Sequence, residues 1–154
     1  MFYLRWSAEE WPKPFHFASL IMVGGLTLFA FSSSFTLEIA DRASLLPNSE
    51  ASVRWMAISI VTWLTFLFLE VVEWTRLIFM ERLDWTTTFG STYLALMISH
   101  WLAVLVGVCW MTYVANDVKK RDVLATAMYT HFLNFIWLVL LFTLYMSNLT
   151  LDGI

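Results

Sequence analysis

Four ionisable side chains stand inside apolar stretches of the sequence. The stretch LFLEVVEW carries Glu70 and Glu73, and His100 and His131 interrupt two later apolar runs, the second of which also holds Asn134. An ionisable group in hydrocarbon costs about 2.5 kcal/mol or more unless it is paired. These residues therefore indicate one of three chemistries: polar contacts between helices, a proton relay through the carboxylates, or haem ligation by the two histidines.

Glu70 and His100 are predicted to lie at similar depth in neighbouring antiparallel helices. Glu70 comes about 17 residues, or roughly 25 Å, into its helix, and His100 comes about 10 residues, or roughly 15 Å, into the next helix from the opposite side. In helices about 39 Å long these heights nearly coincide. We therefore expect a polar contact between Glu70 and His100, with Glu73 one turn closer to water.

The two histidines are predicted to lie at different heights. His131 is about nine residues, or roughly 13 Å, into its helix, which leaves an axial gap of about 11 Å to His100. This gap exceeds what two imidazoles on one iron allow, so a small four-helix cytochrome b is kept only as an alternative. The histidines lie on separate helices with no HxxxH or ExxH pair, which disfavours a metal site. No catalytic motif such as GxGxxG, a Walker loop or GxSxG appears.

The composition indicates an integral membrane protein. Of the 154 residues, 60% are hydrophobic and only 14% are charged, with a mean hydropathy of +0.70, whereas soluble domains carry about 25% charged residues. The net charge of -3 gives no reason to expect nucleic acid as a partner. Cys109 is the only cysteine, which excludes a disulfide framework within the chain.

Four apolar segments are long enough to span a membrane, since a spanning helix needs about 20 residues. They cover about residues 15–39, 53–79, 90–115 and 123–147. Short connections predict a single membrane domain, residues 1–154, folded as an all-α antiparallel bundle. The small residues at 24–25 and 32–34 are expected to permit close helix approach.

Charge gives a weak indication of topology. Four basic residues fall on the side of the two termini and five on the other side, among them the cluster KKR at 119–121. This cluster favours a cytoplasmic third connection. Both termini are then expected in the periplasm of a bacterial-type inner (plasma) membrane.

The order and spacing of these motifs resemble subunit III of the haem-copper cytochrome c oxidases. The stretch GSTYLALMISHWLAVLVG is similar to the sixth helix of that family, with Gly90 and His100 in matching places. THFLNFIW is similar to the seventh helix, with His131 and Trp137 matching and Asn134 in place of an aspartate. LFLEVVEW resembles the end of the fifth helix, and SSSFTLEIADRA resembles the fourth.

The resemblance implies an accessory, non-catalytic subunit of a terminal oxidase in aerobic respiratory electron transport. Such a chain would stabilise catalytic subunit I, contact other oxidase subunits and membrane lipids, and have candidate roles in proton uptake and lipid binding. Haem and copper are expected in the partner subunits and no cofactor in this chain, with phospholipid a candidate ligand. The family usually has seven or five helices where this chain has room for four, and a second histidine of its sixth helix is Ala103 here.

Other functions stay open at the level of sequence. A subunit-III-like protein can accompany a nitric oxide reductase or a quinol oxidase, and the chemistry would then lie in a different partner. A transporter or proton-conducting subunit using Glu70 and Glu73 would need a continuous polar path, and the first and fourth segments offer few polar residues at matching depth.

Overall fold

The computed structural model describes residues 20–46, 50–79, 83–116, 118 and 120–146, and these form four long helices. The helices are α2 (Leu20–Ser44), α3 (Glu50–Phe79), α4 (Thr88–Asn116) and α5 (Lys120–Leu141), and a π-helical turn, Phe142–Met146, continues α5. All four are long and apolar enough to cross a membrane. The predicted fold class, an all-α membrane bundle with four spans, is confirmed.

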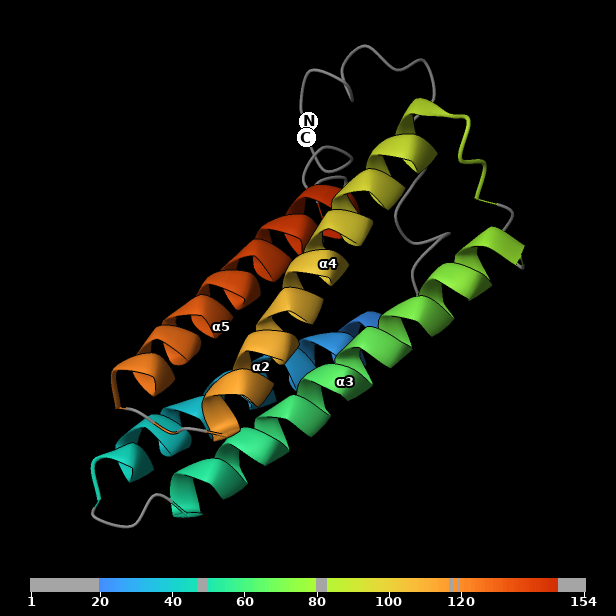
Figure 1. The fold of residues 1–154 in the computed structure, drawn as a ribbon. Helices are drawn as coiled ribbons and strands as arrows, with labels where there is room; N and C mark the ends of the chain where they lie inside the picture. The colour runs from blue at the N-terminus through green and yellow to red at the C-terminus, as the bar shows by residue number, and fades with distance from the viewer. Residues whose placement is uncertain (1–19, 47–49, 80–82, 117, 119, 147–154) are drawn as a thin grey trace, which may run out of the picture.

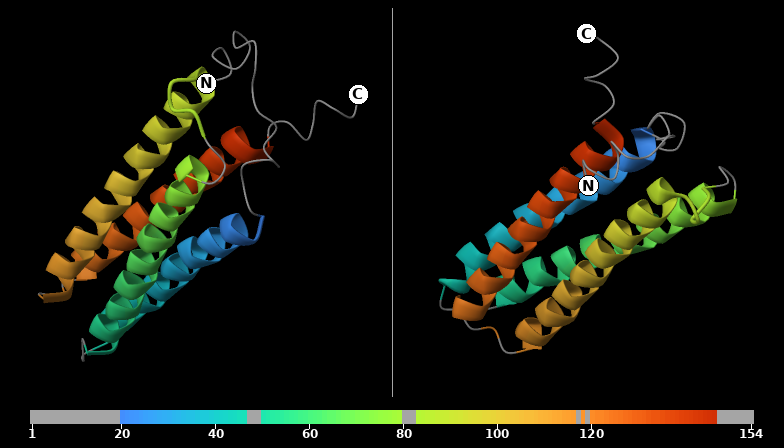
Figure 2. Two further views of the ribbon diagram at one scale, coloured as in Figure 1. Left: turned by 90° about the vertical axis from the view of Figure 1, so that its right-hand side faces the viewer. Right: turned by 90° about the horizontal axis from the view of Figure 1, so that it is seen from above.

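The helices run alternately up and down in an elongated bundle (Figure 1). The connections from α2 to α3 and from α4 to α5 lie at one end, and the connection from α3 to α4 lies at the other (Figures 1 and 2). Each helix packs on its neighbours in sequence, and α2 also packs along α5, which closes the arrangement. Antiparallel neighbours are the outcome that short connections favour.

The helices extend past the ends that hydrophobicity predicts, most clearly at the connection from α2 to α3. α2 continues to Ser44 rather than stopping at residue 39, and α3 starts at Glu50 rather than at residue 53. Ion pairs at i, i+4 spacing support these polar ends, with 3.1 Å between Arg42 Nη2 and Glu38 Oε1 and 3.6 Å between Arg54 and Glu50. The predicted start at residue 15 and end at residue 147 lie outside the described residues.

Serine hydroxyls connect α2 to α3. Ser59 Oγ donates to the carbonyl of Ser33 at 3.2 Å, and Ser52 Oγ donates to the carbonyl of Ala40 at 2.8 Å. Small residues therefore do permit close approach of these helices, as membrane packing favours. The glycines at 24–25 take no part in this contact, because a Cβ at either would meet no atom of the described residues within 4 Å.

A compact turn starts α4 and fixes its position. Asp84 Oδ1 accepts hydrogen bonds from the backbone N–H and the hydroxyl of Thr86, at 2.9 and 2.7 Å, and these bonds lower the pKa of Asp84. Thr87 Oγ1 accepts from the backbone N–H of Gly90 at 3.0 Å, as an N-cap does. A Cβ at Gly90 would overlap the carbonyl of Asp84, so the close turn requires glycine there.

Candidate functional site

Of the four ionisable residues that the sequence places inside apolar stretches, Glu70 is the most deeply buried. Its side chain is completely buried (0% exposed), and neither carboxyl oxygen has a hydrogen-bond partner within the described part of the chain. The indole N–H groups of Trp63 and Trp74, on the same helix, are also buried without a partner there. Buried polar atoms of this kind cost about 1–3 kcal/mol each, so α3 carries an energetic penalty along this face.

The hydrogen bond expected between Glu70 and His100 is absent. The His100 ring lies against Phe66, with 5.9 Å between ring centroids, and Phe66 is one turn before Glu70 on α3. One turn displaces the carboxyl along the helix by about 6 Å. The imidazole instead points to α5, where its Nε2 lies 3.4 Å from the carbonyl oxygen of Leu133. The predicted contact is therefore wrong, because this register separates the two side chains.

Aromatic rings enclose His100 in the centre of the bundle. Its ring centroid is 5.5 Å from that of Trp137, and Phe66 contacts Trp137 edge-on at 5.2 Å. The indole N–H of Trp137 donates to Thr27 Oγ1 at 3.1 Å. One cluster therefore joins α2, α3, α4 and α5, and aromatic contacts of this geometry stabilise a core beyond their buried area.

Glu73 has a partner on its own helix. Its two carboxyl oxygens accept from Arg76 Nε at 2.9 Å and Nη2 at 2.7 Å. The carboxyl is almost fully buried, whereas the arginine side chain keeps about a quarter of its surface exposed. Arg76 can thus extend towards the interface while neutralising the carboxylate.

Asn134 links α5 to α2. Its Nδ2 donates to the carbonyl of Ala30 at 2.8 Å and to the hydroxyl of Ser34. The side chain is buried, and its Oδ1 has no hydrogen-bond partner among the described groups. Asn134 therefore forms a polar contact between two helices, and its side-chain oxygen is an acceptor without a partner among the described groups.

His131 lies apart from His100. It is half exposed on the outer side of α5, and its Nε2 is 4.0 Å from Glu38 Oε2 on α2. The two histidines thus have different surroundings, one in the aromatic core and one in a groove between α2 and α5. In the described parts of the chain, no three His, Cys, Asp or Glu side chains gather as a metal site requires.

Three hydrogen-bond or ion-pair partners of the side chains described above were not predicted from the sequence. Arg76 and Arg42 could have been assigned from their i, i+3 and i, i+4 spacing to glutamates. The Thr27–Trp137 contact joins residues 110 positions apart, and no local pattern signals such a pair.

Sequence comparison finds relatives among curated oxidase subunits. The chain is 24% identical over 139 residues to quinol oxidase subunit 3 of Bacillus subtilis, an alignment that covers 85% of this chain and 67% of the relative. It is also 24% identical over 154 residues to cytochrome c oxidase subunit 3 of Alkalihalophilus pseudofirmus, covering 94% of this chain and 75% of the relative. The chain is therefore similar to subunit III of these oxidases over most of its length. No protein-family model matches it.

The subunit III similarity concerns the whole bundle. An alignment over 94% of the chain has to include all four helices. Quinol oxidase subunit 3 of Bacillus spizizenii matches in the same way, with 23% identity over 85% of this chain and 67% of the relative. The buried polar residues thus lie within a similarity that extends over most of the chain, not within a short shared motif.

Proposed function

We propose that this chain is an accessory, non-catalytic subunit III of a haem-copper terminal oxidase in aerobic respiration. In this role it packs beside catalytic subunit I and stabilises it. The observation that carries the proposal is the match of the entire four-helix bundle to chains named subunit 3 of cytochrome c and quinol oxidases. The haem and copper would lie in the partner subunits.

The buried polar residues support a packing role in this proposal. The core cluster around His100 fixes the four helices to one another. A proton relay would need a chain of hydrogen-bonding groups, and Glu70 has no such neighbour within the described segments. We therefore assign His100 and its aromatic neighbours to the stability of the subunit, with proton uptake by Glu70 as a subsidiary role only.

The proposed location is the plasma membrane of a bacterium, with both termini in the periplasm. In the sequence, KKR at 119–121 stands where the chain passes from α4 to α5. Basic connections favour the cytoplasmic side. Phospholipid is the ligand class we propose for the surface that partner chains leave uncovered.

A quinol oxidase is the second candidate complex. Two of the three relatives are named quinol oxidase subunit 3, which favours this complex over a nitric oxide reductase. The distinction lies in the electron donor, and the donor site would be in another chain. Oxygen consumption by the purified complex, measured with reduced cytochrome c and with a quinol, separates the two candidates.

Purification in mild detergent through a tag on this chain tests the proposal. We expect a large membrane chain with haem and copper ligands to co-purify in a fixed ratio. The proposal fails if the tagged protein emerges alone from membranes of respiring cells.

A further inference from the structure

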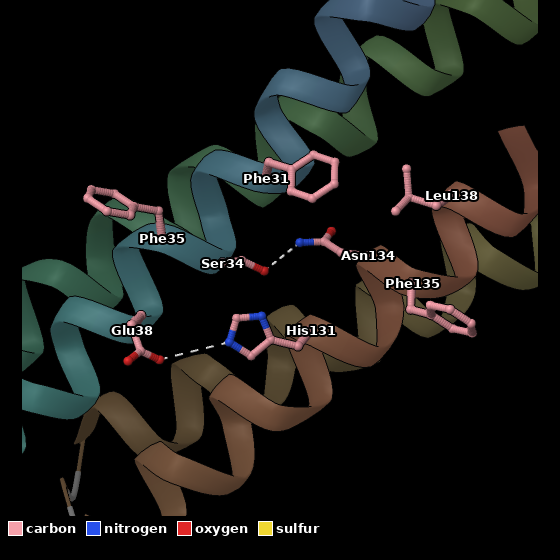
Figure 3. Close-up of a pocket in the computed structure, with 8 residues that line it drawn as sticks. All are labelled: Phe31, Ser34, Phe35, Glu38, His131, Asn134, Phe135 and Leu138. Carbon is pink, nitrogen blue, oxygen red and sulfur yellow. Dashed lines mark hydrogen bonds and ion pairs between the residues drawn. The ribbon is translucent and has the colours of Figure 1, made fainter.

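An open groove runs between α2 and α5 on the outside of the bundle (Figure 3). It has a volume of about 460 Å³. Its α2 wall extends from Phe31 to Glu38 and its α5 wall from His131 to Leu138. Both walls use positions i, i+3, i+4 and i+7, which is one face of a helix over two turns. The groove is therefore two matching helical stripes side by side.

Such a pair of stripes has the shape that receives a third helix. Side chains at i, i+3, i+4 and i+7 form the ridges between which a neighbouring helix packs. Each stripe is about 10 Å long. Phe35 and Phe135 project outward from the two walls and are 68% and 65% exposed, so they offer large apolar surfaces on either side of the groove.

Two ionisable side chains face this groove inside the membrane-spanning segments. Glu38 and His131 are 44% and 52% exposed, and Glu38 lies about 9 Å along the axis from the end of α2 at Ser44. Glu38 Oε1 accepts from Arg42 at 3.1 Å, whereas Oε2 is 4.0 Å from His131 Nε2. That distance is longer than a hydrogen bond. A further polar group could therefore bond to both Glu38 and His131.

Lipid is a poor occupant for this surface. Ionisable residues within membrane spans face protein or water rather than acyl chains. An acyl chain has no hydrogen-bond donor for the Glu38 carboxylate or the His131 imidazole. A protein helix can provide both an apolar face for the phenylalanines and a polar side chain at this depth.

We propose that the groove between α2 and α5 seats a transmembrane helix of another subunit. That helix would place a hydroxyl, amide or other hydrogen-bond donor opposite Glu38 and His131. The inference rests on the proposed function, because it identifies the face on which this subunit meets a partner in the oxidase complex.

Site-specific photo-crosslinking in native membranes tests the docking surface. The photoreactive p-benzoylphenylalanine replaces Phe35 or Phe135 in the full chain, and Phe68 on α3, which is 67% exposed, is the matched control. We expect positions 35 and 135 to form adducts with a membrane-spanning peptide of one other chain, identified by mass spectrometry. The control position should not form that adduct.

A groove-filling substitution provides the second measurement. Leu138→Trp, combined with the photoreactive residue at 35, should abolish the adduct, whereas Val61→Trp on the exposed side of α3 should leave it unchanged. Adducts with lipid only, with a second copy of this chain only, or equally from position 68 would overturn the inference. No change with Leu138→Trp would also overturn it.

The result is separable from the test of the proposed function. If a haem-containing chain co-purifies but the groove gives no helix adduct, the docking surface is wrong and the proposed function stands. If the groove crosslinks to a helix of a chain unrelated to an oxidase, the docking surface stands and the proposed function fails.

Discussion

Replacement of Glu70 by methionine is expected to stabilise the protein. Methionine is a flexible, unbranched and apolar side chain that fills core space well. The substitution removes two carboxyl oxygens that are buried without a hydrogen-bond partner among the described residues. Leaving a buried polar group unsatisfied costs about 1–3 kcal/mol, so we expect the free energy of unfolding to rise by about that amount.

Glu73→Met is the matched control, because Glu73 is almost as deeply buried and three residues away on α3. Its carboxylate, unlike that of Glu70, has an ion pair with Arg76 at 2.7 Å. Its removal leaves a partly buried guanidinium without that partner, so the free energy of unfolding should fall by about 1–3 kcal/mol. The two substitutions are therefore predicted to have opposite signs.

Both values can be measured by reversible unfolding of the purified chain in detergent micelles, with helix content followed by circular dichroism. The reasoning is refuted if Glu70→Met lowers the free energy of unfolding by more than about 1 kcal/mol while Glu70→Gln leaves it unchanged. That pattern would mean that the carboxyl has a polar partner in the folded chain.

Three further outcomes are expected. Gly107→Ala should lower the thermal midpoint, with a loss of about 1–3 kcal/mol, because a Cβ there lies 2.9 Å from Cε1 of Tyr129; an unchanged midpoint would contradict this. Trp137→Phe should cost about 1 kcal/mol through loss of the hydrogen bond to Thr27, and adding Thr27→Val should cost little more in a double-mutant cycle. The pKa of Asp84, followed by carboxyl chemical shifts, should lie below the ordinary 3.8, since the threonine two residues later donates two hydrogen bonds to it. The turn is then stabilised above pH 3.8 and loses this contribution as the pH falls through the lowered pKa; a value at or above 3.8 would be against it.

The spans could be predicted from the sequence because a membrane imposes one strong requirement, about 20 apolar residues in a row. The predicted ends of the helices were less accurate for the same reason. Apolar length does not detect a polar final turn, and α2 continues through Asp41 and Arg42 to Ser44, supported by an ion pair between Arg42 and Glu38.

Contacts between helices could be predicted only in part. Axial rise gives the height of a side chain but not the direction in which it points, since a helix turns by about 100° per residue. Glu70 and His100 were therefore expected to meet, whereas the imidazole points to Leu133 on α5. Glu38 and His131 meet across α2 and α5 although no sequence pattern connects them.

The central claim is that this chain is an accessory subunit whose haem lies in a partner. The most direct measurement is the visible difference spectrum of material purified in mild detergent through a tag on this chain, for the wild type and for His100→Gln. Glutamine can retain a hydrogen bond to the carbonyl of Leu133, which His100 approaches at 3.4 Å. We predict haem bands of equal intensity per tagged chain in both preparations. A wild-type preparation without haem, or haem bands lost in His100→Gln, would contradict the account.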